Sequence, residues 1–314
     1  MIWVITGATG LIGRSLVPAL LGKGHRVVAL SRSASNFYAG FDHHRLDARN
    51  FDLTSNSSMG LGDLSEDVGL IMLASKISVS TDLRKLVDHM AIDTYGHIRL
   101  TESLRSVLTH IIYASSCTVY GWPSQLPVDE SATLNPSSVY ALTKVASEHM
   151  ITSMCHNWGI SLAILRISQL YGPGAPLIGA MYNFLKAAYA GDRPSITCNP
   201  DSYRDYCHVA DVVRAIDAVV LQNSKGIYNI GSGQPTSILN LAKICLQVAS
   251  CNLEPEIEPR TIGTNMWLDI SRARNELSYE PRIELQLGVQ MEYERLYSNH
   301  QKMPVQFCKG SPEG

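Results

Sequence analysis

Two groups of residues in this chain have types and spacings that suit chemistry on a bound dinucleotide. A phenol and an ammonium four residues apart suit acid/base work at a reacting hydroxyl, and they are Tyr140 and Lys144. A glycine series near the N-terminus suits a phosphate-binding turn, and it consists of Gly7, Gly10 and Gly13. Together the two groups predict hydride chemistry, which neither group indicates alone.

The glycine series follows a short apolar run and precedes an amphipathic one, which is the setting that a dinucleotide cradle requires. The first glycine permits a tight turn, the second lets backbone amides approach a pyrophosphate, and the third lets helix and strand pack closely. The positive end of the helix then faces the phosphates. Because the spacing is GxxGxxG rather than GxGxxG, the cradle is predicted from this context rather than from the glycines alone.

The end of the second expected strand, residues 26–30, bears on the identity of the cofactor. Ser31 and Arg32 stand there in place of an acidic residue that would accept hydrogen bonds from a ribose. A guanidinium beside hydroxyls suits a 2′-phosphate, which favours NADP(H). NAD stays open, because an arginine can also stack on adenine or lie solvated at the surface. Asp47, after the expected third strand, is placed to meet the adenine amino group.

Tyr140 and Lys144 lie on one face of a helix because they are four residues apart. A phenol with a pKa of about 10 is a poor base at neutral pH, and a nearby ammonium is expected to favour the phenolate and lower that pKa. Lys144 could also hold the ribose hydroxyls of the cofactor. Ser116 follows an apolar strand at residues 111–114, which would place its hydroxyl where a substrate oxygen could share a hydrogen bond with Tyr140.

The elements that must position these side chains alternate along the chain. Short apolar runs at residues 2–5, 26–30, 69–73, 109–114 and 161–167 are separated by segments with helical spacing. Such alternation predicts an α/β fold with a Rossmann-like, doubly wound parallel sheet and helices on both faces. Ligands bind at the carboxyl ends of the strands in such sheets.

The regular alternation weakens after residue 170, where glycine and proline separate single helices. We expect a dinucleotide-binding domain over residues 1–170, to which residues 205–229 return. Residues 171–204 and 230–297 are expected to form a smaller C-terminal substrate-binding domain. The polar residues 298–314 predict a flexible tail.

Composition and charge limit the partners of the chain. Its 314 residues contain 26 Lys and Arg against 28 Asp and Glu, for a formal net charge of −2, so no basic field attracts nucleic acid or an anionic membrane. No secretory signal or membrane-spanning stretch is evident, and a cytoplasmic location is expected. The 7 cysteines form no CxxC pair, and neither they nor the adjacent His43 and His44 have the spacing of metal ligands, so no metal is expected.

The chain resembles the NAD-dependent epimerase/dehydratase family of extended short-chain dehydrogenases/reductases, the group that includes UDP-glucose 4-epimerase. The resemblance extends over residues 2–297. Besides the glycines and the Tyr140–Lys144 pair, it rests on YASSCTVYG at residues 113–121, the segment 165–174, RDYCHVAD at 204–211 and YNIGSG at 228–233.

The resemblance implies a role for each candidate residue. The catalytic triad would be Ser116, Tyr140 and Lys144. Arg204 would contact the diphosphate of a nucleotide sugar, and a homodimer would form with the helix of Tyr140 contributing. The cofactor-binding set would be Gly7, Gly10, Leu11, Ile12, Gly13, Ser31, Arg32, Asp47, Ala74, Tyr140 and Lys144. The substrate-binding set would be Ser75, Ser116, Gln169, Arg204 and Arg260.

Several positions depart from the pattern of the family. Asp93 and Gln169 each stand where the family usually has asparagine. The dehydratase branch carries an Asp-Glu pair directly after the catalytic Ser or Thr, whereas this chain has Cys117 and Thr118. A thiol with a pKa of about 8.5 and an alcohol do not supply the acid and base of a β-elimination, which disfavours dehydration.

Three functions are therefore weighed. The leading one is a nucleotide-sugar epimerase that transfers hydride transiently from the sugar C4 to a bound NAD(P). The alternative is an NADPH-dependent reductase of a 4-keto nucleotide sugar or a related carbonyl, which Ser31 and Arg32 favour. The third is a non-catalytic dinucleotide-sensing protein, because a fold alone does not fix a function.

Overall fold

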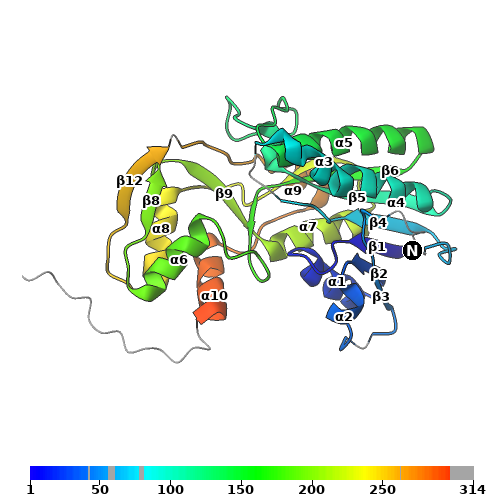
Figure 1. Ribbon diagram of the computed structural model, residues 1–314, viewed down its shortest axis with the longest axis horizontal. Helices are drawn as coiled ribbons and strands as arrows, with labels where there is room; N and C mark the ends of the chain where they lie inside the picture. The colour runs from blue at the N-terminus through cyan, green and yellow to red at the C-terminus, as the bar shows by residue number, and fades with distance from the viewer. Residues whose placement is uncertain (42, 56–60, 78–80, 262, 298–314) are drawn as a thin grey trace, which may run out of the picture.

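A seven-stranded sheet forms the centre of the larger part of the molecule (Figure 1). The computed structural model describes residues 1–41, 43–55, 61–77, 81–261 and 263–297. The strand order is β10-β6-β5-β4-β1-β2-β3, and all neighbouring strands run parallel. The predicted Rossmann-like doubly wound sheet is thus confirmed. Its strands are β1 (Ile2–Thr6), β2 (Arg26–Ser31), β3 (Leu46–Asn50), β4 (Val68–Met72), β5 (Leu108–Ser116), β6 (Ser161–Ile167) and β10 (Gly226–Ile230).

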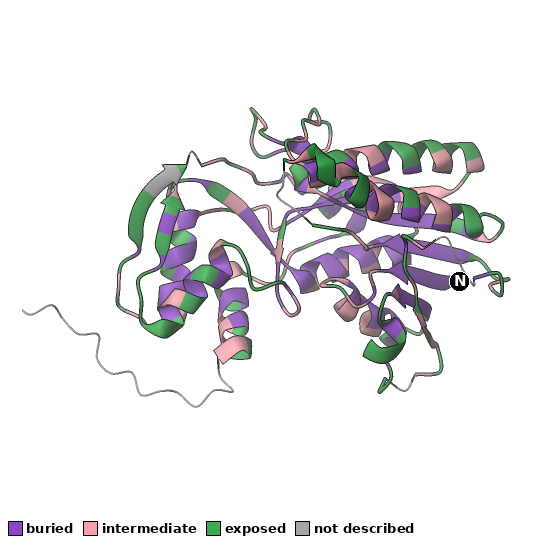
Figure 2. Ribbon diagram, in the orientation of Figure 1, coloured by how far each residue is buried: buried purple, intermediate pink, exposed green. Residues whose placement is uncertain are grey.

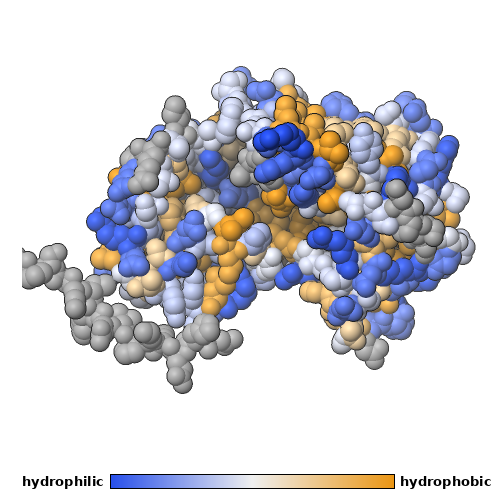
Figure 3. All heavy atoms as spheres, in the orientation of Figure 1, coloured by the Kyte–Doolittle hydropathy of each residue, from blue (hydrophilic) through white to orange (hydrophobic). Residues whose placement is uncertain are grey.

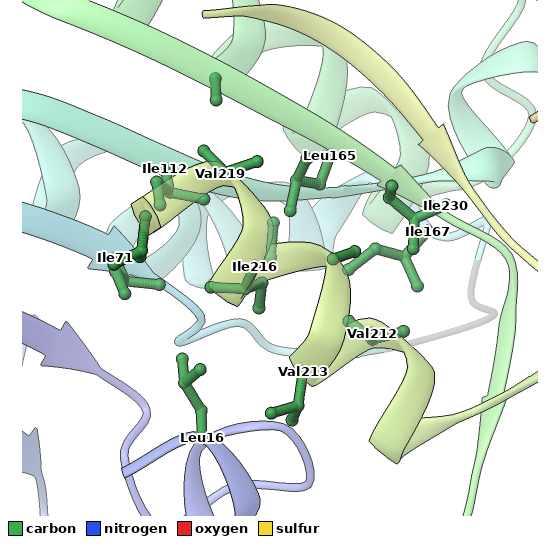
Figure 4. Close-up of a cluster of buried hydrophobic side chains, with 14 of the residues drawn as sticks. Leu16, Ile71, Ile112, Leu165, Ile167, Val212, Val213, Ile216, Val219 and Ile230 are labelled. Carbon is green, nitrogen blue, oxygen red and sulfur yellow. The ribbon is translucent and has the colours of Figure 1, made fainter. Parts of the chain in front are cut away.

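Helices cover both faces of this sheet, because each parallel neighbour requires a crossover connection. Figure 4 shows one face, where Ile216 of α7 lies near Ile71 and Ile112 of the strands, and Val213 of α7 lies on the side of Leu16 of α1. The helices on this face are α1 (Gly13–Gly22), α7 (Val209–Gln222) and α9 (Ser271–Leu277). On the other face lie the 3-10 turn η1 (Leu83–Lys85), α3 (Leu86–Met90), the π-helical turn η2 (Ala91–Gly96), α4 (His97–Ser103) and α5 (Val139–Trp158). The short α2 (Ala34–Phe37) follows β2, and η3 (Cys117–Tyr120) follows β5.

The long helix α5 has clear start and stop signals in the sequence. The Ser138 hydroxyl accepts a hydrogen bond from the Ala141 amide at 3.2 Å, and Gly159 ends the helix in the left-handed conformation. The residues at positions 143, 144, 147, 148 and 151 are buried, so one side of the helix packs on the sheet and carries several polar groups inward. Figure 2 shows the resulting contrast between the buried strands and the exposed outer side of α5.

A second, smaller part lies beside the sheet, on the left in Figure 1. Its own apolar core joins Phe184 and Leu185 of α6 to Leu241 and Cys245 of α8 and to Val289 of α10. Its elements are β7 (Gln169–Tyr171), α6 (Ala180–Ala190), β8 (Ser195–Cys198), β9 (Tyr203–His208), β11 (Pro235–Ser237), α8 (Ile238–Val248), β12 (Glu256–Thr261) and α10 (Leu285–Tyr297). They form a sheet of order β11-β9-β7 and the pair β12-β8.

The chain passes between the two parts more often than the sequence indicates. β10 pairs with β6, and α7 packs against the sheet. The helix α9, which the sequence analysis placed in the substrate-binding domain, also packs against the larger part, because Ala273 and Leu277 join the core that contains Val212. Apart from this correction the domain limits stay a prediction, and residues 298–314, the expected tail, lie outside the described residues. Within the described part of the chain, no helix combines the length and apolar character needed to cross a membrane.

Candidate active site

The glycine loop connects β1 to α1 at the carboxyl edge of the sheet. Gly7 has a φ of +66°, and a Cβ built on it would lie 2.8 Å from the Ala74 amide nitrogen. A Cβ on Gly13 would collide with the carbonyl oxygens of Gly7 and Ala8. Only glycine fits these two positions without a shift of the backbone, so the loop has the close packing that a dinucleotide cradle needs. Leu11 and Ile12, half-buried, complete the loop.

A chain of hydrogen bonds fixes the loop after β4 that lies under the glycines. The Thr6 hydroxyl accepts from the amides of Leu73 and Ala74 at 3.1 and 3.2 Å, so its own proton goes to His97 Nε2 at 3.0 Å. His97 Nδ1 then donates to the Asp93 carbonyl at 3.2 Å. Burial lowers the pKa of His97 to about 4, which keeps its ring neutral. A neutral ring accepts from Thr6 and donates to Asp93, so the direction of both hydrogen bonds is defined.

The residues after β2 lie beside the glycine loop. The Thr9 hydroxyl donates to the Ser31 hydroxyl at 3.1 Å, and the Ser33 amide donates to the same oxygen at 3.3 Å. The Arg32 side chain is exposed, and its charge contributes to a lowered pKa of Asp52, after the hydrogen bonds from Thr54. The predicted pair Ser31 and Arg32 therefore adjoins the cradle.

Asp47 does not lie where the sequence analysis expected it. It is the second residue of β3, and its carboxylate accepts hydrogen bonds from Arg49 at 2.6 and 2.9 Å. It borders a polar pocket with Ile2 and Arg26, which begin β1 and β2. Asp47 is thus at the amino edge of the sheet, opposite the glycine loop, and the predicted contact with adenine is wrong. The acidic residue that follows β3 at the carboxyl edge is Asp52, which the sequence reasoning missed.

Ser116, Tyr140 and Lys144 meet where β5 ends. Ser116 is the last residue of β5, and its hydroxyl accepts from the Thr118 hydroxyl at 3.0 Å. Lys144 is buried, and its Nζ donates to the Ala114 carbonyl at 2.8 Å. The same nitrogen lies 5.6 Å from the centre of the Tyr140 ring. The helix α5 therefore presents the phenol and the ammonium to the strand end that carries Ser116.

The electrostatics of this group differ from the expectation. Burial raises the pKa of Tyr140 above its ordinary value, the negative charge of Asp93 raises it further, and the Ser116 hydroxyl opposes this effect. Burial also lowers the pKa of Lys144, while the charges of Asp93 and Glu148 raise it. The expected fall in the pKa of Tyr140 is therefore wrong, because the sequence does not show how deeply the phenol lies or which acid is near it.

A buried ion pair between β6 and α5 contacts the end of β5. Arg166 of β6 donates to both carboxylate oxygens of Glu148 in α5, at 3.2 and 2.8 Å. The Ser115 hydroxyl donates to the same carboxylate, and Arg166 also donates to the Tyr120 hydroxyl at 3.1 Å. Tyr120 in turn donates to the Asn229 side chain of β10 at 2.7 Å. These motif residues thus join β5, β6, β10 and α5 rather than face a ligand.

The predicted substrate-binding residues come from both parts of the molecule. Ser75 follows β4, and its hydroxyl is buried with no hydrogen-bond partner among the described residues. Gln169 is exposed on β7. Arg204 of β9 donates to the Thr264 hydroxyl at 2.7 Å and also to the Thr264 carbonyl. Arg260 lies in β12, and its side chain is outside what the structure describes. In the view of Figure 3 the surface is hollowed between the two parts.

Two motif residues in β9 have structural partners. Asp205 accepts hydrogen bonds from the Ser232 amide and hydroxyl at 2.7 and 2.6 Å, and from the Gly233 amide at 3.2 Å. His208 caps α7 by accepting from the Ala210 amide at 3.2 Å. Both residues therefore hold the junction between β9, β10 and α7.

The glycine cradle, the parallel sheet and the Tyr140–Lys144 couple define the class of a Rossmann-like dinucleotide-binding protein with an acid/base pair at the carboxyl edge. The chain belongs to the NAD-dependent epimerase/dehydratase family, whose family model matches residues 3–231. This confirms the resemblance drawn from the motifs.

Individual relatives extend over nearly the whole chain. It is 29% identical to the UDP-glucose 4-epimerase of Mycolicibacterium smegmatis over 298 residues, which cover 91% of this chain and 95% of that protein. The crystal structure of UDP-glucose 4-epimerase with UDP-glucose from Thermotoga maritima has a TM-score of 0.84 at 23% identity, covering 96% of this chain and 100% of that one. UDP-glucuronic acid 4-epimerase from Bacillus cereus, in complex with UDP-glucuronic acid and NAD, has a TM-score of 0.82 at 24% identity, with coverage of 95% and 100%.

Proposed function

We propose that the protein is a nucleotide-sugar 4-epimerase that uses a bound nicotinamide dinucleotide. The observation that carries this proposal is the meeting of Tyr140, Lys144 and Ser116 at the edge of the sheet where the glycine loop also lies. The relatives named above are 4-epimerases of UDP-sugars, which does not favour the alternative of a net reductase.

Tyr140 would take the proton of the sugar 4-hydroxyl and return it after the sugar has turned over. Ser116 would share a hydrogen bond with the same sugar oxygen, and Lys144 would stabilise the phenolate. A nicotinamide held by the glycine loop and Lys144 would supply reversible hydride transfer at the sugar C4. No net oxidation occurs, because the proton and the hydride that leave the sugar both return to it.

Cys117 and Thr118 make dehydration a poor alternative. Burial raises the pKa of the Cys117 thiol to about 12, so the thiol stays neutral at physiological pH. The Thr118 hydroxyl donates a hydrogen bond to the Ser116 hydroxyl. Neither side chain supplies the acid or base of a β-elimination, which supports epimerisation without loss of water.

The substrate would be a nucleoside diphosphate sugar that lies between the two parts of the molecule. Arg204 would face the diphosphate, since a guanidinium can bind phosphate oxygens in a bidentate manner. Its bonds to Thr264 hold the side chain in place. We assign Ser75 and Gln169 to the sugar and Arg260 to the phosphates because the family resemblance implies these contacts.

For the cofactor, the residues after β2 support a preference for NADP(H). No acidic side chain follows β2 to accept from a ribose, and the exposed Arg32 would meet a 2′-phosphate beside Ser31. The test is to measure the dissociation constants of NADPH and NADH for the wild type and to compare their ratio with the ratio for the control variant Arg32→Ala. A wild-type protein that binds NADH more tightly than NADPH would overturn this part of the proposal.

We also propose a homodimer formed through α3, η2 and α5. Val87 and Tyr95 are 75% and 55% exposed, and Leu142 and Met150 of the adjacent α5 are 37% and 38% exposed. Such a group of exposed apolar side chains is typical of an interface. A dimer mass in light scattering that Val87→Glu converts to a monomer mass would support it.

A cytoplasmic location also stays a prediction.

The decisive test of the epimerase is incubation of the purified protein with UDP-, GDP-, CDP- and dTDP-sugars and chromatographic separation of the C4 epimers. We expect interconversion of at least one pair without consumption of added NADPH. Tyr140→Phe, which removes only the hydroxyl, is the matched control and should lower kcat by at least about 100-fold. Stoichiometric oxidation of NADPH on a 4-keto sugar nucleotide, without epimerisation, would favour the reductase instead.

A further inference from the structure

A cluster of buried polar groups lies beside Lys144, and two of its members, His89 and Asp93, have no role in the mechanism described so far. Both ring nitrogens of His89 lack hydrogen-bond partners among the described residues, while the Ser75 hydroxyl and the Lys76 amide approach the Asp93 carboxylate. The side chains of His89 and Asp93 are 0% exposed. Each unpaired buried polar group costs about 1–3 kcal/mol, so the burial of the His89 ring is costly for stability.

The two titratable members of the cluster lie close together. His89 Nδ1 is 3.9 Å from Asp93 Oδ2. His89 belongs to α3, and Asp93 belongs to the π-helical turn that follows it. The Asp93 carbonyl accepts from Ser147 at 2.8 Å and from His97 at 3.2 Å. The backbone of Asp93 is therefore held from both α5 and α4, and its side chain lies in the interior.

The groups around Asp93 come from every element packed against it. From α5, Lys144 and Tyr140 interact electrostatically with it, and from β5 Tyr113 does so. The loop after β4 contributes Ser75 and the backbone of Lys76. Burial raises the pKa of Asp93, while the positive charge of Lys144, then the hydrogen bonds from Ser75 and the Lys76 amide, and last the nearby His89 lower it.

We propose that Asp93, paired with His89, is a positioning residue that sets the charge of Lys144 and thereby the pH range in which Tyr140 can exchange a proton. This proposal rests on the proposed function. An ionised Asp93 stabilises the Lys144 ammonium and opposes the Tyr140 phenolate. His89, whose Nδ1 lies 3.9 Å from Asp93 Oδ2, favours the ionised form of the carboxylate.

The test removes the charge of Asp93 with little change in shape. In Asp93→Asn, Tyr140 loses a nearby negative charge and Lys144 loses a counter-ion, so the pKa values of both should fall. Both limbs of the pH profile of kcat/KM for epimerisation should therefore move to lower pH, by about one unit. His89→Gln should move both limbs in the same direction by less, and the double variant should match Asp93→Asn.

Thr94→Val is the matched control. Thr94 lies in the same π-helical turn and is buried, and its hydroxyl hydrogen-bonds with Ser147 at 2.9 Å. The substitution removes a buried polar contact but no charge, so the limbs of the profile should stay in place. Equal shifts in Thr94→Val and Asp93→Asn would show that packing rather than charge is responsible and would overturn the proposal.

A second readout does not depend on catalysis. The carboxyl carbon of Asp93, labelled with ¹³C and assigned by its loss in Asp93→Asn, should titrate above the ordinary range of aspartate, and His89→Gln should move its midpoint higher. An Asp93 midpoint that His89→Gln leaves unchanged would overturn the pairing. If the wild type epimerises no nucleotide sugar, the proposed function fails, while this titration still decides whether the pair exists.

Discussion

Arg166→Met should destabilise the protein strongly, although Arg166 contacts no predicted ligand. The side chains of Arg166 and Glu148 are only 4% and 5% exposed. Two hydrogen bonds join the guanidinium to the carboxylate, and a third goes to the Tyr120 hydroxyl. Removing one partner of a buried pair leaves the other charge uncompensated, which costs about 3–5 kcal/mol.

The assay is urea unfolding followed by tyrosine and tryptophan fluorescence, with the free energy of unfolding taken from the midpoint and the slope. Glu148→Gln/Arg166→Met is the matched control, because it removes both charges together. The double variant should recover part of the loss, since no ion is then left unpaired. A loss below about 1 kcal/mol in Arg166→Met would refute the view that this pair stabilises the strand ends.

Three further predictions concern the cradle, the pH dependence of stability and the diphosphate. Gly7→Ala should lower dinucleotide affinity by at least about 10-fold in fluorescence titration, because a Cβ would lie 2.8 Å from the Ala74 amide nitrogen; unchanged affinity would contradict the cradle. The pKa of buried His97 is about 4 against an ordinary 6.5, so the stability that neutral His97 contributes is present above pH 6.5 and is lost as the pH falls toward 4, by about 3 kcal/mol at most. In His97→Asn the free energy of unfolding should fall less steeply over that window, and an identical slope would exclude His97 as its source. Arg204→Met should raise KM for the nucleotide sugar by about 10-fold or more with a smaller change in kcat, and an unchanged KM would remove Arg204 from the diphosphate site.

The sequence predicted the sheet well because five of its strands are apolar and fully or largely buried. It failed at β3, whose residues are polar and partly exposed. Without an apolar run to mark its limits, the predicted carboxyl end of that strand lies too early, so the predicted acidic residue after it is Asp47, whereas the structure has Asp52 there. If the strand is predicted to end at Asn50, the sequence shows an acidic residue, Asp52, two positions later.

The candidate site was predictable in its residue types but not in its charges. Tyr140 and Lys144 are visible as a pair with helical spacing, whereas the influence of Asp93 on both depends on tertiary packing. The π-helical turn that holds Asp93 inserts an extra residue into the helical register. A periodicity of 3.6 residues therefore does not place Asp93 and His89 beside α5.

The smaller part of the molecule is assembled from separate stretches of chain. Along the sequence, α6 precedes α7 and β10, and α8 follows them. The helix α9 then packs on the larger part, and α10 comes after it. Any continuous fragment that contains the whole of its core therefore also contains α7, β10 and α9, which pack on the larger part. During synthesis, Phe184 and Leu185 emerge from the ribosome about 100 residues before Val289, so the apolar side of α6 remains without its last partners until α10 has been made. A nascent chain halted after β10 would keep that surface uncovered and should bind general chaperones more strongly than the full-length chain.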